Sequence, residues 1–339
     1  MESMPPSVSI IVPCYNEQAT IRKLLEAILQ QDYPRAQMEV VIADGLSQDA
    51  TRAEIAAFQA EHPDLDVRVV DNMARSIPSA VNCGILAARG ETIIRIDAHS
   101  RPYPDYVRRC LAALDAGLGD NVGGVWEIKP GNQGWMAQSI AAAAAHPLGA
   151  GDARYRSAGA QASEVDTVPF GAFRRSLVDK IGLIDETLLS NEDYEFNVRI
   201  RQAGGRIWLD PGIATVYYAR STLGDLARQY WRYGYWKFRM LQRYPATLRW
   251  RQALPPLFVA SLVGLAALAW QPLAGWLLAL DLALYVGALL LAGAHAAIRQ
   301  QKPFLLIGLP LAIATMHMAW GGSFLWSMLT LPMDNRTHG

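Results

Sequence analysis

The chain has 339 residues, which is enough for one large domain or two smaller ones, and its 31 acidic residues balance its 31 basic residues. A net charge of zero argues against electrostatic attraction to nucleic acid, so we expect no nucleic-acid partner. The three cysteines are widely spaced, which argues against a disulfide framework or a cysteine metal site and is typical of a reducing compartment.

Residues 8–97 alternate between apolar, β-branched runs and segments with apolar residues at helical spacing. The runs predict strands over 8–12, 38–44, 66–71 and 92–97, and the spaced segments predict helices over 18–30, 51–60 and 76–88. This alternation is typical of a mostly parallel sheet with helices on both faces.

The pattern is less regular after residue 117. We expect a strand over 121–128, a helix over 135–151, a strand, turn and helix over 165–185, a helix over 191–205, and a strand pair or one bent strand over 206–219. The helix over 191–205 begins with acidic residues, which suit the positive end of the helix dipole, and a glycine pair marks its end.

Charge is unevenly spread over the rest of the chain. Residues 253–330 contain three charged residues, whereas residues 221–252 contain seven Lys or Arg residues and a single Asp. We therefore divide the chain into a globular domain over 1–220, an amphipathic interface segment over 221–252 and a membrane domain over 253–330.

Three hydrophobic segments lie at about 254–270, 273–294 and 304–330, each near or above the ~20 residues that cross a bilayer as a helix. Burial in a protein core is the alternative, and the scarcity of charge argues against it. Basic residues precede the first segment and separate the second from the third, so we expect a multi-pass anchor in the inner (cytoplasmic) membrane. The first residues lack a signal-peptide pattern, which places the globular domain on the cytoplasmic side. Three crossings would leave the C-terminus outside, unless Gly321 and Gly322 make the last segment re-entrant or interfacial.

Four of the predicted strands end on polar residues. Their ends carry Pro13-Cys14-Tyr15-Asn16-Glu17, Asp44-Gly45, Asp71-Asn72 and Asp97-Ala98-His99. In an open sheet the carboxyl ends of the strands meet at one edge, and ligands bind there. A single acidic residue at a strand end usually forms a turn or caps a helix, but four polar ends at one edge indicate a binding site.

Asp97 and His99 point to the same side if the strand continues through them. A carboxylate and an imidazole can hold one divalent cation, Mg²⁺ or Mn²⁺, and leave positions open for phosphate oxygens. A supporting or capping role for His99 is the alternative.

Five segments carry a joint resemblance: VSIIVPCYNEQATIRKLLEAILQQDYP, VVIADGLSQDAT, SAVNCGILAARGETIIRIDAH, VPFGAFRR and NEDYEFNVRIRQAGGRI. In this order they resemble glycosyltransferase family 2, whose members have the GT-A fold, a Rossmann-like mixed sheet with helices on both faces. VDTVPFGAFRR, NEDYEFNVRIRQAGG and ARQYWRYGYWK resemble, more narrowly, the membrane-bound succinoglycan-type exopolysaccharide glucosyltransferases. The resemblance covers about residues 7–258.

This resemblance implies a nucleotide-sugar donor. Its nucleoside and diphosphate would be contacted by Pro13, Tyr15, Asn16, Glu17, Asp44, Arg75, Asn82 and Asp97. Asp44 would accept a hydrogen bond from N3–H of uracil. The family's DxD position reads Asp97-Ala98-His99 here, so an imidazole replaces one carboxylate, and imidazole tolerates Mn²⁺ more readily than Mg²⁺.

The resemblance also implies a catalytic acidic pair at Glu192 and Asp193. In the family a carboxylate of this pair is the general base that deprotonates the acceptor hydroxyl, and we assign that role to Asp193. Stabilisation of the helix N-terminus is the alternative. Direct displacement with a single base inverts the anomeric centre.

QYWRYGYWKFR, residues 229–239, resembles the Q-x-x-R-W element of polysaccharide synthases, with Tyr233 in place of the Trp. Gln229, Arg232 and Trp236 would share one helix stripe and contact the acceptor or a diphosphate. An interfacial helix that touches anionic lipids is the alternative. The missing Trp and the few hydrophobic segments argue against processive synthesis.

The sequence thus predicts an inverting, metal-dependent hexosyltransferase that transfers glucose from UDP-glucose to a polyprenyl-diphosphate-linked saccharide in exopolysaccharide biosynthesis. A polyprenyl-monophosphate acceptor is a second reading. A membrane-tethered sugar-nucleotide sensor is a third, and it would have no use for Asp193. The sequence leaves open whether copies of the chain associate as a homo-oligomer.

Overall fold

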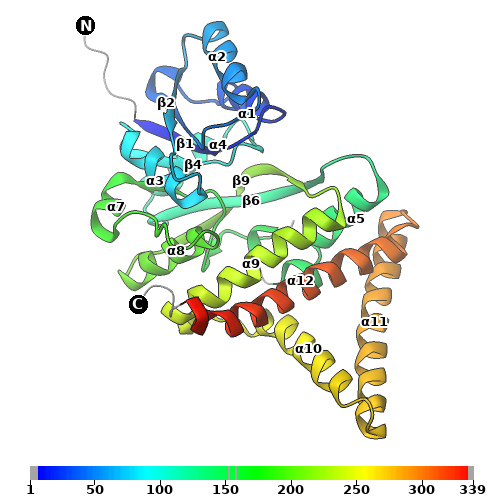
Figure 1. The fold of residues 1–339 in the computed structure, drawn as a ribbon. Coiled ribbons are helices and arrows are strands. Elements are labelled where there is room, and N and C mark those ends of the chain that lie inside the picture. Colours follow the sequence, from blue (N-terminus) through cyan, green and yellow to red (C-terminus); the bar gives the residue numbers. More distant parts are fainter. Residues whose placement is uncertain (1–6, 152, 157–158, 335–339) are drawn as a thin grey trace, which may run out of the picture. The chain divides into compact units, whose positions relative to one another are not determined.

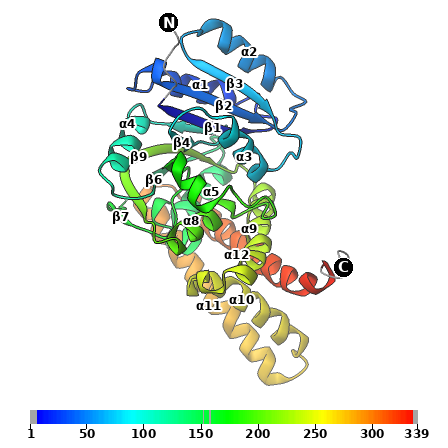
Figure 2. The same ribbon diagram turned by 90° about the vertical axis from the view of Figure 1, so that its left-hand side faces the viewer.

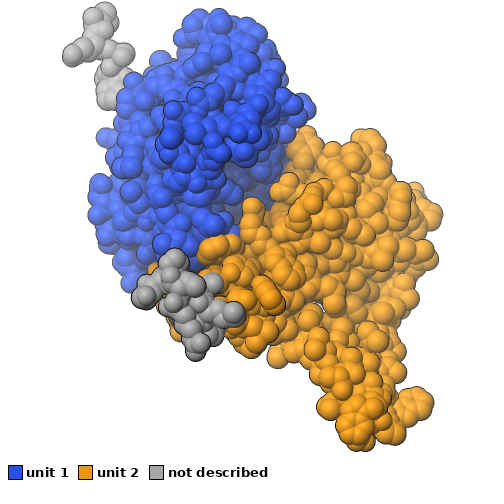
Figure 3. Space-filling view, viewed as in Figure 1, with its two compact units in different colours: residues 1–127, 154–217 blue, residues 128–153, 218–339 orange. Residues whose placement is uncertain are grey.

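The computed structural model describes residues 7–151, 153–156 and 159–334. The chain divides into two compact units (Figure 3). Unit 1 comprises residues 1–127 and 154–217, and unit 2 comprises residues 128–153 and 218–339. The chain therefore leaves unit 1, returns to it, and leaves it again close to the predicted boundary at residue 220. The excursion over 128–153 has no counterpart in the predicted division at residues 220 and 252.

The strands of the described residues form one nine-stranded sheet (Figure 1). They are β1 (Val8–Cys14), β2 (Met38–Asp44), β3 (Asp66–Asp71), β4 (Thr92–Arg95), β5 (Ser100–Pro102), β6 (Asn121–Pro130), β7 (Ser163–Glu164), β8 (Ala172–Arg174) and β9 (Ile207–Ala219). Their order is β3-β2-β1-β4-β8-β6-β9-β5, and β7 pairs with β9.

The sheet is mixed. Strands β1 to β4 pair in parallel, whereas β4 with β8, β6 with β8, β5 with β9 and β7 with β9 pair antiparallel. The strand–helix alternation predicts a mostly parallel sheet, and this holds only up to β4. Beyond it β8 runs antiparallel to β4, and β6 runs antiparallel to β8, which gives the mixed sheet that the resemblance to the GT-A fold implies.

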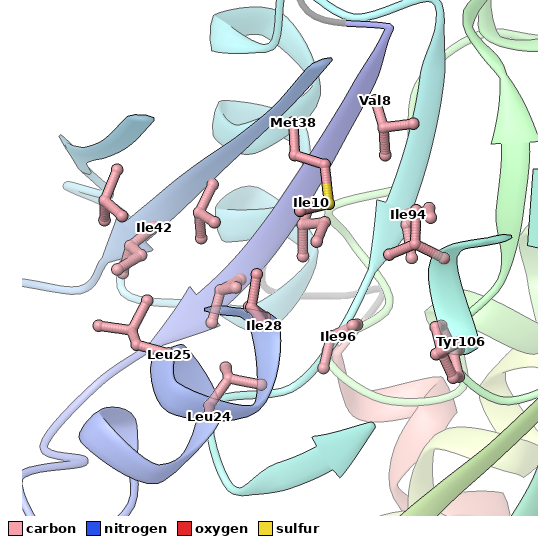
Figure 4. Close-up of a cluster of buried hydrophobic side chains, with 14 of the residues drawn as sticks. Val8, Ile10, Leu24, Leu25, Ile28, Met38, Ile42, Ile94, Ile96 and Tyr106 are labelled. Atoms are coloured by element: carbon pink, nitrogen blue, oxygen red, sulfur yellow. The ribbon is translucent and has the colours of Figure 1, made fainter. Parts of the chain in front are cut away.

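Helices cover both faces of the sheet. In unit 1 they are α1 (Ile21–Leu29), α2 (Thr51–Glu61), α3 (Ile77–Ala87), α4 (Tyr106–Asp115), α7 (Arg175–Ile181) and α8 (Glu192–Gln202), with short 3-10 turns at Arg35–Gln37 and Arg154–Arg156. Successive strand residues point to opposite faces, so they join two buried clusters. Ile10 lies in one cluster with side chains of α1 and α4 (Figure 4), which also includes Val12 and residues of α2. Ile11 lies in the other cluster, with residues of α3, α7 and α8. Each such buried side chain contributes ~1.5–3 kcal/mol, and burial on both faces fixes the strand register.

Three elements lie where the sequence predicts none: β5, α4 and the two-residue strand β7. Strand β5 pairs with β9, and α4 buries Tyr106, Val107 and Cys110 in the core. Pro102, the last residue of β5, and Pro104 are typical of a loop, so the local sequence predicts neither β5 nor α4.

Unit 2 is helical. It contains α5 (Trp135–Ala145), α6 (Pro147–Ala150), α9 (Leu223–Arg243), a 3-10 turn at Pro245–Thr247, α10 (Trp250–Ala267), α11 (Pro272–Gln300) and α12 (Leu305–Asp334). Helix α12 packs against α5, α6, α9, α10 and α11. The contact with α9 is close, because a Cβ at Gly234 would overlap the carbonyl oxygen of Trp320.

Among the described residues two helices are long and apolar enough to cross a membrane: Pro272–Gln300 and Leu305–Thr330. The expectation of three apolar membrane segments is therefore corrected to two candidates. Helix α10 has 18 residues, but Arg251 and Gln252 in its first turn lower its mean hydropathy. The two candidates also differ, since 50% of the most apolar stretch of α12 is buried against 11% for α11.

Candidate active site

The carboxyl ends of β1, β2 and β3 lie in register, with Cys14 opposite Asp44 and Asp44 opposite Asp71. The loops that follow β1 and β2 are joined by hydrogen bonds. The Asn16 backbone N–H donates to Ser47 Oγ at 2.8 Å, and the Gln48 N–H donates to Asn16 Oδ1 at 2.8 Å. This pairing holds Asn16 in a left-handed conformation, with a φ of 54°.

Pro13, Tyr15 and Glu17 belong to the same rim. Pro13 is half-buried at the end of β1, while the Tyr15 ring is exposed beside the loop after β2. The Glu17 N–H donates to Thr51 Oγ1 at 2.7 Å. The structure thus brings the predicted nucleoside-contacting residues of the first loop together at one sheet edge.

Asp44 lies at this edge with a fully buried carboxylate. It accepts hydrogen bonds from the Ser47 N–H at 3.0 Å, from Ser47 Oγ at 2.5 Å and from Arg52 Nε at 2.6 Å. Hydrogen bonds to Asp71 and Asp44 raise the pKa of Arg52. A carboxylate has about four lone-pair sites, and these hydrogen bonds use three of them.

Arg75 and Asn82 differ in their surroundings. Arg75 is exposed and left-handed, with a φ of 54°. Asn82 is buried, donates to the Ile184 carbonyl at 2.9 Å and to Glu186 Oε1 at 2.8 Å, and accepts from the Ile184 N–H at 2.9 Å. Its amide therefore joins α3 to the segment before α8, and a nucleotide contact for Asn82 stays a prediction.

Asn72 belongs to the polar strand ends that the sequence indicates, although the resemblance assigns it no ligand contact. It directly follows β3, is 2% exposed, and donates through Nδ2 to the Ser76 carbonyl at 2.9 Å. Its Oδ1 is a buried acceptor that has no hydrogen-bond partner among the described residues.

Asp97 and His99 lie in a turn. Strand β4 ends at Arg95, and the Ser100 N–H donates to the Asp97 carbonyl at 2.9 Å. The strand predicted over 92–97 therefore ends two residues early, and the condition on which Asp97 and His99 would point to the same side is not met. His99 Nδ1 lies 3.2 Å from Glu17 Oε1, which links the turn to the loop after β1.

These residues fit a divalent cation only in part. In the described part of the chain no three His, Cys, Asp or Glu side chains gather as metal ligands. Asp97 and His99 would supply one carboxylate and one imidazole, and the remaining ligands would have to come from a bound molecule such as a diphosphate.

Arg95 connects this turn to α8. Its guanidinium is mostly buried, and Nη2 lies 3.4 Å from Asp97 Oδ1 and 3.1 Å from Glu192 Oε1. Burial works to lower the pKa of Arg95, but the charges of Asp97 and Glu192 outweigh it, so that pKa is raised. The sequence gives one signal for Arg95, a charged residue at the end of a buried strand.

Helix α8 places the acidic pair in its first turn, after Asn191 in the left-handed conformation. Glu192 is 5% exposed, and burial raises its pKa, against the opposing charge of Arg95. Asp193 is half-buried and more accessible, and its Oδ1 accepts from the Tyr194 N–H at 2.7 Å.

Glu195, the third acidic residue of this turn, is structural. Arg199 donates to its two oxygens at 2.7 and 3.0 Å and also to the Ile181 and Leu183 carbonyls at 2.5 and 2.7 Å. The charge of Glu195 is thus compensated, and the pair fastens α8 to the end of α7.

Gln229, Arg232 and Trp236 lie on α9, in unit 2, whereas the rim lies in unit 1. Gln229 Nε2 donates to Tyr233 Oη at 2.9 Å, and the Arg232 guanidinium lies 5.9 Å from the Tyr233 ring centroid. Trp236 is half-buried, and its ring lies 5.7 Å from that of Tyr235. Tyr233, which replaces the Trp of the resembled element, therefore organises its two polar neighbours.

Residues 9–182 match the model of glycosyl transferase family 2. The chain belongs to glycosyltransferase family 2. It is 31% identical over 317 residues to the succinoglycan biosynthesis protein ExoA of Rhizobium meliloti, with 93% of each chain covered. The match confirms the resemblance on the strand-end motifs, and glycosyltransferase activity follows from the family.

Two further family comparisons bear on the fold and the relatives' substrates. A mannosyltransferase from Pyrobaculum calidifontis, solved in complex with GDP-Man and Mn²⁺, has a TM-score of 0.63 at 22% identity, covering 95% of this chain and 88% of that one. Its likeness confirms the GT-A fold. A dolichyl N-acetyl-alpha-D-glucosaminyl phosphate 3-beta-D-2,3-diacetamido-2,3-dideoxy-beta-D-glucuronosyltransferase from Methanococcus voltae is 25% identical, covering 91% of this chain and 93% of that protein.

Proposed function

We propose that this family 2 enzyme transfers glucose from UDP-glucose, with inversion, to a polyprenyl-diphosphate-linked saccharide in exopolysaccharide biosynthesis. The observation that carries the proposal is the cluster in unit 1 in which Arg95 contacts both Asp97 and Glu192. It joins the turn assigned to the diphosphate to the helix end assigned to the acceptor hydroxyl. The similarity to a succinoglycan biosynthesis protein supports the biosynthetic role.

The nucleoside is held by the rim. Tyr15 is an exposed ring at the first strand end, and Asp44, whose three hydrogen bonds leave about one lone-pair site unused, is assigned to the uracil N3–H. The flanking positions Pro13, Asn16, Glu17, Arg75 and Asn82 complete the assigned donor site. The unpartnered Oδ1 of Asn72 adds an acceptor at the same edge.

A divalent cation, Mn²⁺ or Mg²⁺, would arrive with the donor and be held by Asp97 and His99. It would neutralise the charge that grows on the leaving diphosphate. Glu17 orients the His99 ring through Nδ1. The mannosyltransferase with GDP-Man and Mn²⁺ supports a cation in this fold.

Asp193 acts as the general base. The acceptor oxygen forms its bond to the anomeric carbon as the bond to the phosphate oxygen breaks, and the hydroxyl proton passes to the Asp193 carboxylate. Glu192, held by Arg95, keeps the first turn of α8 in place. One displacement from an α-linked donor gives a β-linkage.

The acceptor is met at the membrane. We place the enzyme in the inner membrane with unit 1 on the cytoplasmic side, and assign Gln229, Arg232 and Trp236 of α9 to the acceptor or its diphosphate. Two observations support a lipid-linked acceptor: the apolar helices of unit 2 and the name of the Methanococcus voltae relative, which contains a dolichyl phosphate-linked sugar.

The test is UDP release from a panel of UDP-sugars by the full-length protein in detergent, with and without a short-chain polyprenyl-diphosphate-linked saccharide. We expect acceptor-stimulated release from UDP-glucose that chelation of the cation abolishes. Asp193→Asn should lower transfer by ~10²–10⁴-fold and leave UDP binding intact. The control is Asp64→Asn, which removes a surface ion pair with Arg35 and should leave transfer unchanged.

The alternatives predict different products. A polyprenyl-monophosphate acceptor would yield a lipid product with one phosphate, readily identified by mass. Binding of UDP without turnover of any donor, or full activity in the Asp193→Asn protein, would contradict the assignment and favour a sensor.

A further inference from the structure

Helix α9 is amphipathic and too polar to cross a bilayer. Its 21 residues include six charged side chains, Asp225, Arg228, Arg232, Lys237, Arg239 and Arg243. Asp, Lys and Arg at the centre of a membrane helix each cost ~2.5–3.5 kcal/mol, so α9 lies in water or at the membrane surface.

Helix α12 runs beside α9 (Figures 1 and 2). The two backbones touch at Gly234, and the rings of Phe238 and Phe324 lie 5.1 Å apart. Because α12 packs on a surface helix in this way, it cannot separate from α9 to cross the bilayer without exposing this interface.

The rest of α12 is attached to other polar partners within unit 2. Just before its first turn, Lys302 donates to Gln138 Oε1 of α5 at 2.9 Å. At mid-helix, His317 Nε2 lies 2.8 Å from the Leu148 carbonyl of α6. Half of the most apolar stretch of α12 is buried against its neighbours, and a buried core helix passes the same hydropathy test as a membrane span.

Helices α10 and α11 form a hairpin in both views (Figures 1 and 2). Its turn lies at residues 268–271, and apart from Gln271 the side chains around the turn are apolar, with Trp270 74% and Trp276 77% exposed. Helix α10 spans about 27 Å, close to the ~30 Å of a bilayer core.

The end of the hairpin opposite its turn is positively charged. This end, called the base here, comprises the start of α10 and the end of α11 and carries Arg249, Arg251, Arg299 and Lys302. Between the base residues the hairpin has one charged side chain, Asp281 of α11, whose carboxylate accepts from Ser261 Oγ of α10 at 2.8 Å. The apolar tip with its tryptophans suits the interior and interface of a lipid bilayer, and the positively charged residues at the other end suit its headgroups.

We propose that the α10–α11 hairpin enters the lipid bilayer from the face on which α9 lies and returns to that face, and that α12 lies along that face as a surface helix. The N-terminus and the C-terminus are then on the same side of the membrane. The exposed apolar side chains of the hairpin then contact lipid hydrocarbon, and the basic residues at its base contact the phospholipid headgroups. The proposal does not depend on the reaction that unit 1 catalyses.

The test maps both chain ends and the turn in the full-length protein. Epitopes are fused before Met1 and after Gly339, and Gln271→Cys is introduced in a Cys83→Ser background because Cys14 and Cys110 are buried. Protease treatment compares inverted inner-membrane vesicles with spheroplasts, and a membrane-impermeant maleimide probes the introduced cysteine in both preparations.

We expect both epitopes to be digested in the same preparation and protected in the other. The introduced turn cysteine should react from the opposite face or from neither face. A C-terminal epitope that is digested only where the N-terminal one is protected would show that α12 crosses and would overturn the proposal. Labelling of the Gln271→Cys protein from the side of the N-terminus alone would show that the hairpin is not inserted and would also overturn it. Loss of transferase activity leaves all of these readouts unchanged, so the two proposals fail independently.

Discussion

Arg95 shows how one buried residue connects two parts of a site. Its guanidinium stands between Asp97 and Glu192, and both carboxylates come from segments assigned to different steps of the reaction. Breaking a buried ion pair by removing one partner costs ~3–5 kcal/mol, because the other charge stays buried without compensation.

We predict that Arg95→Met lowers the free energy of unfolding of unit 1, and that this decrease becomes larger as the pH rises. Burial already raises the pKa of Glu192 above its ordinary value of 4.5, and removing Arg95 raises it further. The folded state then holds a proton that the unfolded state releases, so the free energy of unfolding falls as pH rises from 4.5 through the folded-state pKa. Urea unfolding of the metal-free protein in detergent, at several pH values, measures this slope.

The control for this prediction is Arg35→Met, which breaks an exposed pair with Asp64 and should cost less than about 1 kcal/mol at any pH. The double variant Arg95→Met/Glu192→Gln should lose the added pH dependence. An Arg95→Met protein as stable as the parent throughout would contradict the bridging role.

At the scale of the elements, close helix packing in unit 2 depends on glycine. A Cβ at Gly234 of α9 would overlap the backbone of α12, whereas Gly264 of α10 has no heavy atom within 4 Å of the position of a Cβ. Both glycines are in helices, so replacement by Ala carries the same intrinsic gain of ~1 kcal/mol in each.

We predict opposite effects for these two substitutions. Gly264→Ala should leave the protein as stable or stabilise it, and Gly234→Ala should destabilise it by ~1–3 kcal/mol, because α9 and α12 must move apart. Thermal unfolding in detergent of the two variants and the parent compares them directly. Equal melting temperatures would mean that the α9–α12 contact contributes little to stability.

How far the sequence predicts each element depends on where its information lies. The strands at 38–44 and 66–71 are confirmed to the residue, because apolar β-branched runs carry their own signal. Strand β5 forms by pairing with β9, which is far away in the sequence, so no local sequence pattern predicts it. Half of the most apolar stretch of α12 is buried among helices, and hydropathy does not distinguish such burial from contact with lipid.

The candidate site likewise has features that the sequence predicts and features that it does not. The motifs predict which side chains gather at the strand ends, because parallel strands place their ends together. The Asp97–Ser100 turn and the partners of Asn82 arise from tertiary contacts, so the sequence does not show them. Arg95 belongs to the same class, since its second partner lies far along the chain on α8.

At the scale of the whole molecule, the hairpin sets how the protein is retained by membranes. Leu284 and Ile298 of α11 are both apolar and exposed, but Leu284 lies within the hairpin and Ile298 lies beside Arg299 at its base. The cost of burying a charge in the bilayer depends on depth and reaches ~2.5–3.5 kcal/mol for Arg near the centre.

We predict that Leu284→Arg weakens retention in membranes and that Ile298→Arg does not. The measurement is the fraction of protein that stays in the pellet after an alkaline carbonate wash of isolated membranes. If both variants were released alike, or neither was, the depth dependence expected of an inserted hairpin would be absent.

The path of the chain also bears on how the protein is made. Helix α5 belongs to the excursion over 128–153, and Gly308 of α12 packs directly on its Ser139. During synthesis α5 therefore leaves the ribosome long before α12 does. The small apolar side chains of α5 stay uncovered while the second half of unit 1 is synthesised. Sheet completion is delayed too, because β6 emerges before β8 and β9, its neighbours in the sheet. The nascent chain thus carries an uncovered helix and an unpaired strand for much of its synthesis, which is the period when chaperones protect such surfaces from aggregation.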